Sequence, residues 1–176
     1  MGTAKIVRRN ISQRSELVFD MHEYSLNADS REIFVHGYTD VYDEEEPGVD
    51  WRMAGQFIKN MTLLTHLSRE LPILIHMITC GGDWNYGMAM YDAIAGCPCS
   101  VTVLSYAHAR SMSSIIIQAA DYRVLQPHAD FLIHHGFYGF DGNHTSAESE
   151  WKQAQVGTKQ MMKIYTDKAK NGTYFK

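Results

Sequence analysis

The chain has 176 residues, of which 45% are hydrophobic and 20% are charged. This length suits one domain with a substantial core, and the composition is that of an ordinary globular protein. The net charge of -4 argues against nucleic-acid binding, which needs a basic patch. The first residues are polar and the apolar stretches are too short to span a bilayer, so we expect no signal peptide, no membrane anchor and a cytoplasmic location.

The cysteines and histidines give no reason to expect a metal or a cofactor. Cys80, Cys97 and Cys99 are too few for a disulfide framework and are typical of a reducing compartment. The pair at Cys97 and Cys99 lacks the second ligand pair of a zinc site, and the nine histidines are scattered along the chain. No nucleotide-binding loop is present, so any use of ATP would come from a partner.

The first third of the chain contains one strand and one helix. Residues 1–30 have weak periodicity and are interpreted as an N-terminal arm. Residues 31–36 form a predicted strand that ends at Gly37. Residues 40–50 are acidic and are expected to be a solvated loop. Residues 51–68 have apolar side chains at helical spacing, and Asp50 is expected to cap this helix.

The middle of the chain alternates strands and helices. Predicted buried strands at residues 73–78 and 100–106 are separated by a turn at Gly81 and Gly82 and a helix over residues 86–96. A helix over residues 111–120 and short strands over residues 122–125 and 131–135 follow. This alternation predicts an α/β fold with parallel strands and crossover helices.

The last predicted element is a long helix. A capping box from Thr145 to Glu148 is expected to start it, and Asn171 and Gly172 are expected to end it. A glycine-rich loop over residues 136–142 precedes it. The apolar side of the helix is predicted to contain Trp151, Ala154, Thr158, Met161, Met162, Tyr165 and Ala169.

Three junctions that each follow a predicted strand contain residues suited to catalysis. Gly81 and Gly82 allow close approach of the backbone, Ser111 stands at a strand-to-helix junction, and His134 stands at the end of an apolar strand. Each has an ordinary structural interpretation when taken alone, as a turn, a helix cap and a core histidine. Their occurrence together, in this order, favours a catalytic site.

This combination resembles the proteolytic subunit of Clp protease (ClpP), from about Arg31 to the end of the chain. The matching segments are Thr79-Cys80-Gly81-Gly82, Gly87-Met88-Ala89-Met90-Tyr91-Asp92, Arg110-Ser111-Met112, and Gln126-Pro127 followed by Leu132-Ile133-His134-His135-Gly136. The seven-residue step from Pro127 to His134 fits the family pattern. For this reason His134, rather than His135, is taken as the family histidine.

The resemblance implies a serine endopeptidase that hydrolyses unfolded polypeptides. Ser111 would be the nucleophile and His134 the general base, and the backbone N–H groups of Gly82 and Met112 would form the oxyanion hole. The implied fold is the ClpP/crotonase-like spiral of ββα units with a protruding C-terminal handle helix. The implied partners are further copies of the chain in stacked rings, an AAA+ unfoldase and peptide substrates bound as an added strand along the 136–142 loop.

The sequence departs from the family pattern at several positions. Arg110 replaces a small residue before the nucleophile, Ser113 replaces a glycine, and Cys80 replaces a proline. The family's third triad residue is an Asp beyond the handle helix. Neither Asp141 nor Asp167 matches that position, so the third triad member is unknown and the domain over residues 31–176 is interpreted as truncated at its C-terminal end.

Other functions stay open at this point. The departures favour a non-catalytic structural subunit. A crotonase-like acyl-CoA enzyme would share the fold but would need carboxylates at the site, for which Asp83 is the candidate. The short and divergent chain also suggests a phage-type member acting in head maturation.

Overall fold

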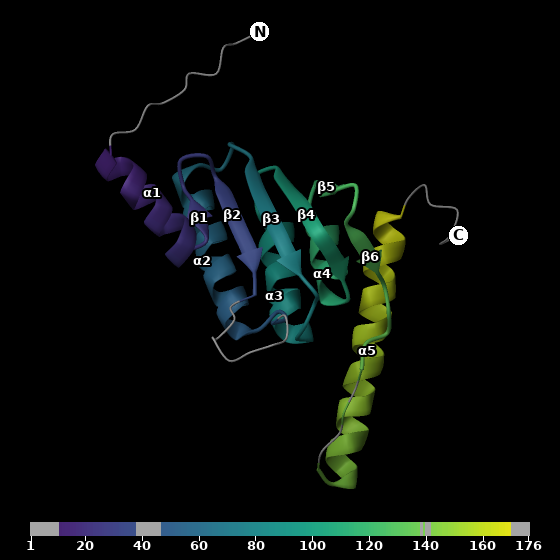
Figure 1. Cartoon of the computed structure of the whole chain (residues 1–176). Coiled ribbons are helices and arrows are strands. Elements are labelled where there is room, and N and C mark those ends of the chain that lie inside the picture. Colours follow the sequence, from purple (N-terminus) through teal and green to yellow (C-terminus); the bar gives the residue numbers. More distant parts are fainter. Residues whose placement is uncertain (1–10, 38–46, 138, 140–141, 170–176) are drawn as a thin grey trace.

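The computed structural model describes residues 11–37, 47–137, 139 and 142–169. Figure 1 shows a sheet with helices behind it and one long helix at its edge. None of the helices in the described ranges is both long and apolar enough to cross a membrane. The elements are α1 (Ile11–Glu23), β1 (Leu26–Asn27), β2 (Glu32–His36), α2 (Trp51–Leu67), β3 (Ile73–Thr79), α3 (Trp84–Ala95), β4 (Val101–Arg110), α4 (Met112–Ile116), a 3-10 turn (Ile117–Ala119), β5 (Tyr122–Leu125), β6 (Asp130–Leu132) and α5 (His144–Lys168).

The sheet has the strand order β1-β2-β3-β4-β5, and β6 also pairs with β4. Strands β2 to β5 are parallel to their neighbours, and β1 is antiparallel to β2. The first half of β4 pairs with β5 and its last three residues pair with β6. The predicted parallel strands with crossover helices are therefore confirmed.

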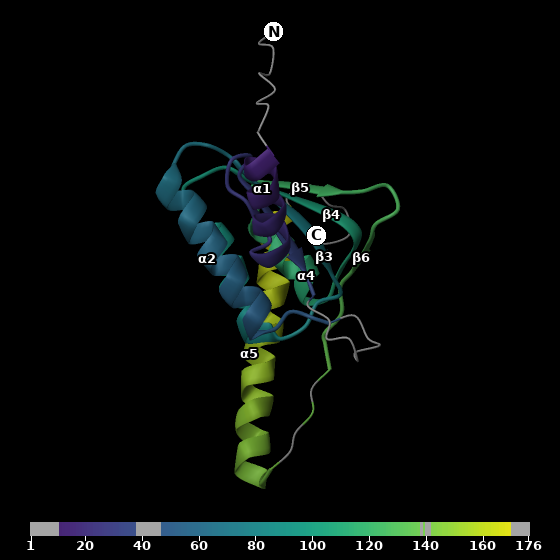
Figure 2. The same cartoon turned by 60° about the vertical axis from the view of Figure 1, so that its left-hand side comes forward.

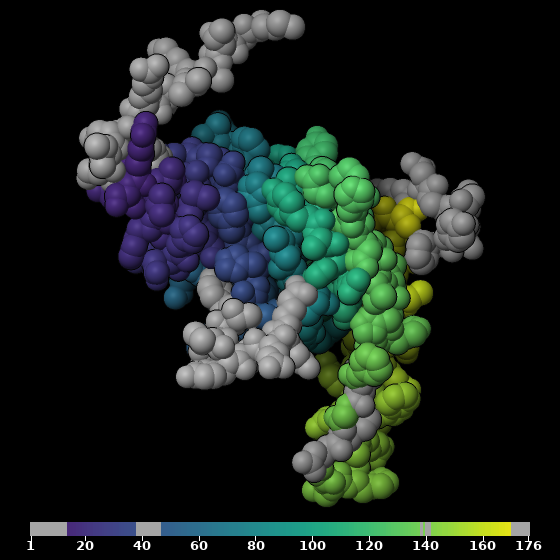
Figure 3. Space-filling view, viewed as in Figure 1, coloured from purple at the N-terminus to yellow at the C-terminus, as the bar shows by residue number. Residues whose placement is uncertain are grey.

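Among the described residues, helices cover one face of the sheet. Ile33, Ile75 and Val103 are in register on β2, β3 and β4, and each is 1% exposed. Burial alternates along all three strands, because α2, α3 and α4 cover the rear face alone (Figures 1 and 2). The strands predicted to be buried are thus buried on one face, while the front face, seen in Figure 3, presents half-buried and exposed side chains.

The boundaries of several elements differ from those predicted. Asp50 caps α2 as expected, since its side chain accepts from the Met53 N–H at 2.8 Å. Helix α3 begins earlier, at Trp84, because Asp83 caps it. The helix predicted over residues 111–120 is only the short α4 and a 3-10 turn, in keeping with its run of β-branched isoleucines.

The long C-terminal helix α5 has a different start from the predicted one. Asn143, not the predicted capping box, is the N-cap, and its Oδ1 accepts from the Ser146 N–H at 3.0 Å. The predicted end at residues 171–172 lies outside the described residues. Trp151, predicted on the apolar side, is 52% exposed, because the first part of α5 projects below the sheet (Figures 1 and 2). Met162, also predicted there, is 39% exposed within the packed part of the helix.

Candidate active site

Ser111 occupies a tight turn between β4 and α4. Its backbone has φ 52° and ψ -125°, a region that residues other than glycine rarely adopt. Its N–H donates to Leu132 O at 3.0 Å, and its side chain makes no capping hydrogen bond to α4. The Ser111 hydroxyl is therefore not used as a helix cap, and the strained turn places it where a strand ends and a helix begins.

The turn at Gly81 and Gly82 lies against Ser111. Gly81 has φ +106° and Gly82 has φ +143°. A methyl group on Gly81 would lie 2.6 Å from Ser111 Cβ and 3.0 Å from Met112 N, and one on Gly82 would lie 2.3 Å from Val49 N. Both the backbone angles and these close approaches require glycine at the two positions.

The N–H groups of Gly82 and Met112, the predicted oxyanion-hole donors, both belong to segments that meet at Ser111. Val49 N–H donates to Gly81 O at 2.5 Å, and Asp83 N–H donates to Val49 O at 2.9 Å. Because the C=O and N–H of one trans peptide group point to opposite sides, and Gly81 O points toward Val49, the N–H of Gly82 points away from Val49. Met112 is the first residue of α4, a position whose N–H has no acceptor within the helix.

His134 follows β6 and is half-buried, in an extended segment rather than at the end of the predicted strand. Its Nδ1 accepts from the Gly136 N–H at 3.2 Å, and its ring centroid lies 5.8 Å from that of Phe137. Among the described residues, no hydrogen bond joins His134 to Ser111. With Nδ1 as an acceptor, the neutral ring carries its proton on Nε2, which cannot then accept the serine proton.

One cleft of about 440 Å³ contains the predicted residues Gly82, Ser111, Met112 and His134. It lies at the carboxyl ends of β3, β4 and β6, the edge at which parallel sheets usually bind ligands. Its other lining residues are Asp83, Trp84, Ile115, His135, Gly136, Phe137, Thr158 and Met161, from α3, α4, α5 and the segment after β6.

Carboxylates near the cleft are engaged elsewhere. Asp83 is the one carboxylate among the described lining residues, and its side chain accepts from the Tyr86 N–H at 3.0 Å as the cap of α3. Asp167 is paired with Lys163 at 2.6 Å on the exposed side of α5. Asp141 lies outside the described residues. Within the described chain, no carboxylate therefore supports His134.

The three departures from the family pattern have different surroundings. Arg110 does not line the cleft: its guanidinium contacts Asp130 on β6, and this hydrogen bonding holds the pKa of Asp130 below its usual range. Cys80 is half-buried. Ser113 is fully buried, and within the described part of the chain its hydroxyl has no hydrogen-bond partner.

A chain of hydroxyl groups that sequence reasoning missed joins α5 to the Ser111 turn. Tyr165 OH and Ser114 Oγ are 2.5 Å apart, and Ser114 Oγ donates to Ser111 O at 2.5 Å. Burial raises the pKa of Tyr165, although the Ser114 bond acts in the opposite direction, so the phenol stays protonated at neutral pH. Helical spacing was the one signal for Tyr165 in the sequence, and it indicates burial but not this contact.

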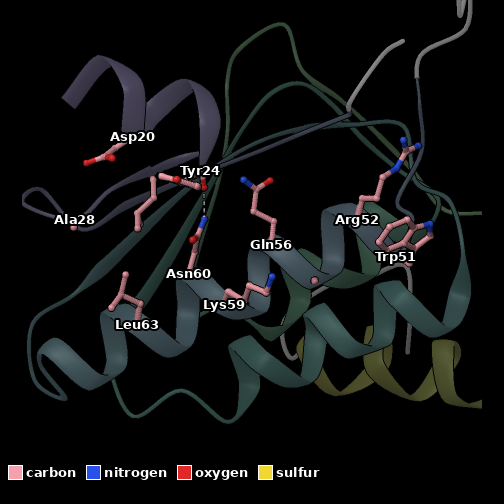
Figure 4. A pocket seen from close by; sticks show the side chains of 11 residues that line it. Asp20, Tyr24, Ala28, Trp51, Arg52, Gln56, Lys59, Asn60 and Leu63 are labelled. Carbon is pink, nitrogen blue, oxygen red and sulfur yellow. Dashed lines mark hydrogen bonds between the residues drawn. The ribbon is translucent and has the colours of Figure 1, made fainter. Parts of the chain in front are cut away.

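A larger cavity, of about 950 Å³, lies between α1 and α2 (Figure 4). Tyr24, Trp51, Gln56 and Lys59 are among its lining residues, and Asn60 Nδ2 donates to Tyr24 O at 2.7 Å. It contains no serine, cysteine or histidine among the described lining residues, so it offers no nucleophile and base. The described residues also contain no cluster of His, Cys, Asp and Glu that could hold a metal ion.

Comparison with known proteins bears on the meaning of this cleft. The Clp protease family model matches residues 31–173, which is most of the chain. The chain belongs to the Clp protease family. This membership confirms the resemblance seen in the sequence, and the α/β structure with its mixed sheet and long C-terminal helix is consistent with the ClpP/crotonase fold.

Individual Clp protease relatives are distant. The ATP-dependent Clp protease proteolytic subunit of Deinococcus radiodurans is 28% identical over 119 residues, 66% of this chain and 58% of the relative. That of Chlorella vulgaris is 27% identical over 122 residues, 68% of this chain and 61% of the relative. The ATP-dependent Clp protease proteolytic subunit 2 of Treponema denticola is 28% identical over 109 residues, which are 61% of this chain and 54% of the relative. The chain thus spans just over half the length of these relatives.

Proposed function

We propose that this chain is a serine endopeptidase that cleaves extended polypeptides. The observation that carries the proposal is the strained Ser111 turn, which shares one cleft with His134 and with the N–H groups of Gly82 and Met112. Relatives named as proteolytic subunits of Clp protease support a peptidase over an acyl-CoA enzyme. Asp83, the carboxylate that an acyl-CoA enzyme would need, already caps α3.

In the proposed reaction, Ser111 Oγ attacks the carbonyl carbon of the scissile peptide bond and His134 Nε2 takes the serine proton. The negative charge that develops on the carbonyl oxygen would be met by the N–H groups of Gly82 and Met112, each worth about 3–4 kcal/mol in characterised oxyanion holes. His134 then returns the proton to the leaving amine, and water hydrolyses the acyl-enzyme by the same route.

His134 must change its hydrogen bonding before it can act as this base. Its Nδ1 now accepts from the Gly136 N–H, and catalysis needs Nδ1 protonated so that Nε2 is free. We propose that assembly or substrate binding moves the segment around Gly136 and frees the ring. Without a carboxylate to orient His134, catalysis is expected to be weak but not absent.

The family also suggests the larger assembly in which this chain would work. We propose that residues 31–176 form the peptidase domain, with the spiral of ββα units and with α5 as the handle helix, and that residues 1–30 form an N-terminal arm. Copies would stack as rings through α5.

An AAA+ unfoldase would supply substrate. The open sheet face offers apolar surface for a protein partner, because Tyr106, Val124 and Ile78 are 37%, 45% and 43% exposed there. Cys80, Cys97 and Cys99 form no disulfide among the described residues, which fits a cytoplasmic location.

A non-catalytic subunit is the second candidate function. The Gly136 N–H bond to His134 and the lack of a supporting carboxylate among the described residues favour it. In that case the chain would assemble with an active subunit and contribute structure only. The two candidates differ in whether the Ser111 hydroxyl is activated.

Reaction with a fluorophosphonate, followed by intact mass, distinguishes the two. We expect a single adduct on the unchanged chain, none on Ser111→Ala, and labelling slowed by about 100-fold or more in His134→Ala. Ser149→Ala removes an exposed serine of α5 and should label normally. A folded chain that gives no adduct would contradict the peptidase proposal and support the non-catalytic subunit.

A further inference from the structure

The Ser111 cleft continues along α5 into a second compartment. This compartment has a volume of about 510 Å³ and shares His135, Gly136 and Thr158 with the cleft. Its remaining lining residues are Trp151, Ala154, Gln155 and Lys159, all from α5. In Figure 1 the segment that follows β6 runs down beside α5, so an extended peptide leaving Ser111 in this direction would pass between the two.

Three of these side chains form a row on α5. Trp151, Gln155 and Lys159 are four residues apart, which places them one above another on one face of the helix. The Trp151 side chain is 52% exposed, although large apolar side chains usually face the core. The row therefore presents an indole ring, an amide and an ammonium group to the compartment.

Lys159 differs from two other lysines of the same helix. Lys152 is paired with Glu148 at 2.7 Å and Lys163 with Asp167 at 2.6 Å, each across one helical turn. The residues three and four positions from Lys159 are Gln155, Val156, Met162 and Lys163, none of which is acidic. Among the described residues, no carboxylate is paired with Lys159. Its charge is thus available to a ligand in the compartment.

We propose that Trp151, Gln155 and Lys159 form a substrate subsite that selects peptides carrying both an apolar residue and a carboxylate. The inference rests on the proposed peptidase function and names part of its specificity. The indole would cover the apolar side chain, the Gln155 amide would bond to the peptide main chain, and the Lys159 ammonium would pair with the carboxylate.

The distance from Ser111 sets which residue of the peptide reaches the subsite. Along α5, Lys159 lies one residue from Thr158 and two residues from Met161 of the cleft, which is about 2–3 Å at 1.5 Å per residue. Trp151 lies seven and ten residues from the same two residues, which is about 10–15 Å. An extended peptide advances about 3.3 Å per residue. The preferred carboxylate therefore lies near the cleft end of the subsite, and the preferred apolar residue lies about three to five residues further along the peptide.

Peptide binding to Ser111→Ala protein tests the subsite without requiring turnover. The probes are fluorescent ten-residue peptides in which a single Glu is placed at each position in turn. A matched series carries Gln in place of Glu. The Gln peptides are also made with either a free or an amidated C-terminus. We expect one or two neighbouring Glu positions to bind about three- to fivefold more tightly than Gln at low salt. Lys159→Gln should abolish this preference, while Lys152→Gln should keep it. A preference for the free C-terminus alone would assign the carboxylate to the peptide end.

Several results would overturn the subsite. These are the absence of peptide binding, equal binding of Glu and Gln peptides, or equal losses in Lys159→Gln and Lys152→Gln. Trp151→Ala should weaken all peptides about fivefold without changing the molecular mass measured by light scattering. A change in mass would instead make this face of α5 an interface between copies. If the Glu preference holds but the unchanged chain hydrolyses none of the peptides, the peptidase proposal fails and the binding site stands.

Discussion

At the scale of single residues, the Ser111 turn is held on several sides. Leu132 O accepts its N–H, Ser114 Oγ donates to its carbonyl, and Gly81 packs against its side chain. A residue with φ 52° and ψ -125° is strained, and such a conformation persists only where its surroundings over-determine it. Tyr165 belongs to these surroundings, because it fixes Ser114 from the far side.

Tyr165→Phe should reveal this positioning role. The change leaves the ring in place but removes the hydroxyl that bonds to Ser114 Oγ, which keeps its bond to Ser111 O, so the unfolding free energy should fall by about 1 kcal/mol. Labelling of Ser111 by a fluorophosphonate should slow several-fold, because the turn is less firmly held. Tyr91→Phe, at a half-buried tyrosine of α3 that lines no part of the cleft, is the matched control. A loss of stability with an unchanged labelling rate would make Tyr165 purely structural.

The residues of the site could be predicted from the sequence only in part. The segments that contain Gly82, Ser111 and His134 follow strands, and parallel strands end at one edge, so their meeting in one cleft was foreseeable. The backbone angle of Ser111 was not foreseeable, because it depends on contacts with segments distant in sequence. The Gly136 bond to His134 joins residues two apart, but it depends on the local path of the chain after β6, which no sequence pattern specified. Tyr165 was foreseen as buried, but a spacing cannot show which hydroxyl it meets.

At the scale of elements, local caps decided where the helices begin. Asp50 and Asp83 each accept from the N–H three residues later and start α2 and α3. Asn143 does the same for α5 and displaced the capping box predicted at Thr145. The sequence offered several cap residues near each helix, and the choice among them depends on how the preceding chain arrives, which no local pattern contains.

The cap of α2 should make stability depend on pH. Burial alone would raise the pKa of Asp50, but the Met53 N–H and the Arg52 guanidinium together outweigh it, so the pKa is lowered. A lowered folded pKa means that the ionised cap stabilises the fold above the unfolded value of about 4 and that this contribution is lost as pH falls through the folded pKa.

Asp50→Asn keeps a capping oxygen but cannot titrate. Its unfolding free energy in urea should therefore fall less than that of the unchanged chain between about pH 5 and pH 3. Asp50→Ala should lose about 1 kcal/mol at pH 7, where the ionised cap acts fully. Parallel curves for Asp50→Asn and the unchanged chain over this range would show that the charge of Asp50 contributes nothing.

At the scale of the whole molecule, α5 divides into a packed half and a projecting half. Its buried residues run from Ala154 to Tyr165, whereas residues 148–153 are all exposed. Figures 1 and 2 show the first half standing clear of the sheet. Helices gain most of their stability from packing on one face, so the projecting half should be weakly held in a single copy of the chain.

Hydrogen exchange measured along α5 should detect the low local stability of the projecting half and its increase when copies assemble. In dilute monomer, amides of residues 148–153 should exchange at least about tenfold faster than those of residues 158–165, because only the latter half packs against the core. As concentration rises and copies associate, stacking through α5 should slow exchange in residues 148–153. Slowing in α1 and α2 alone, around the exposed Trp51 and Phe19, would instead place the contact between copies at the opposite end of the molecule.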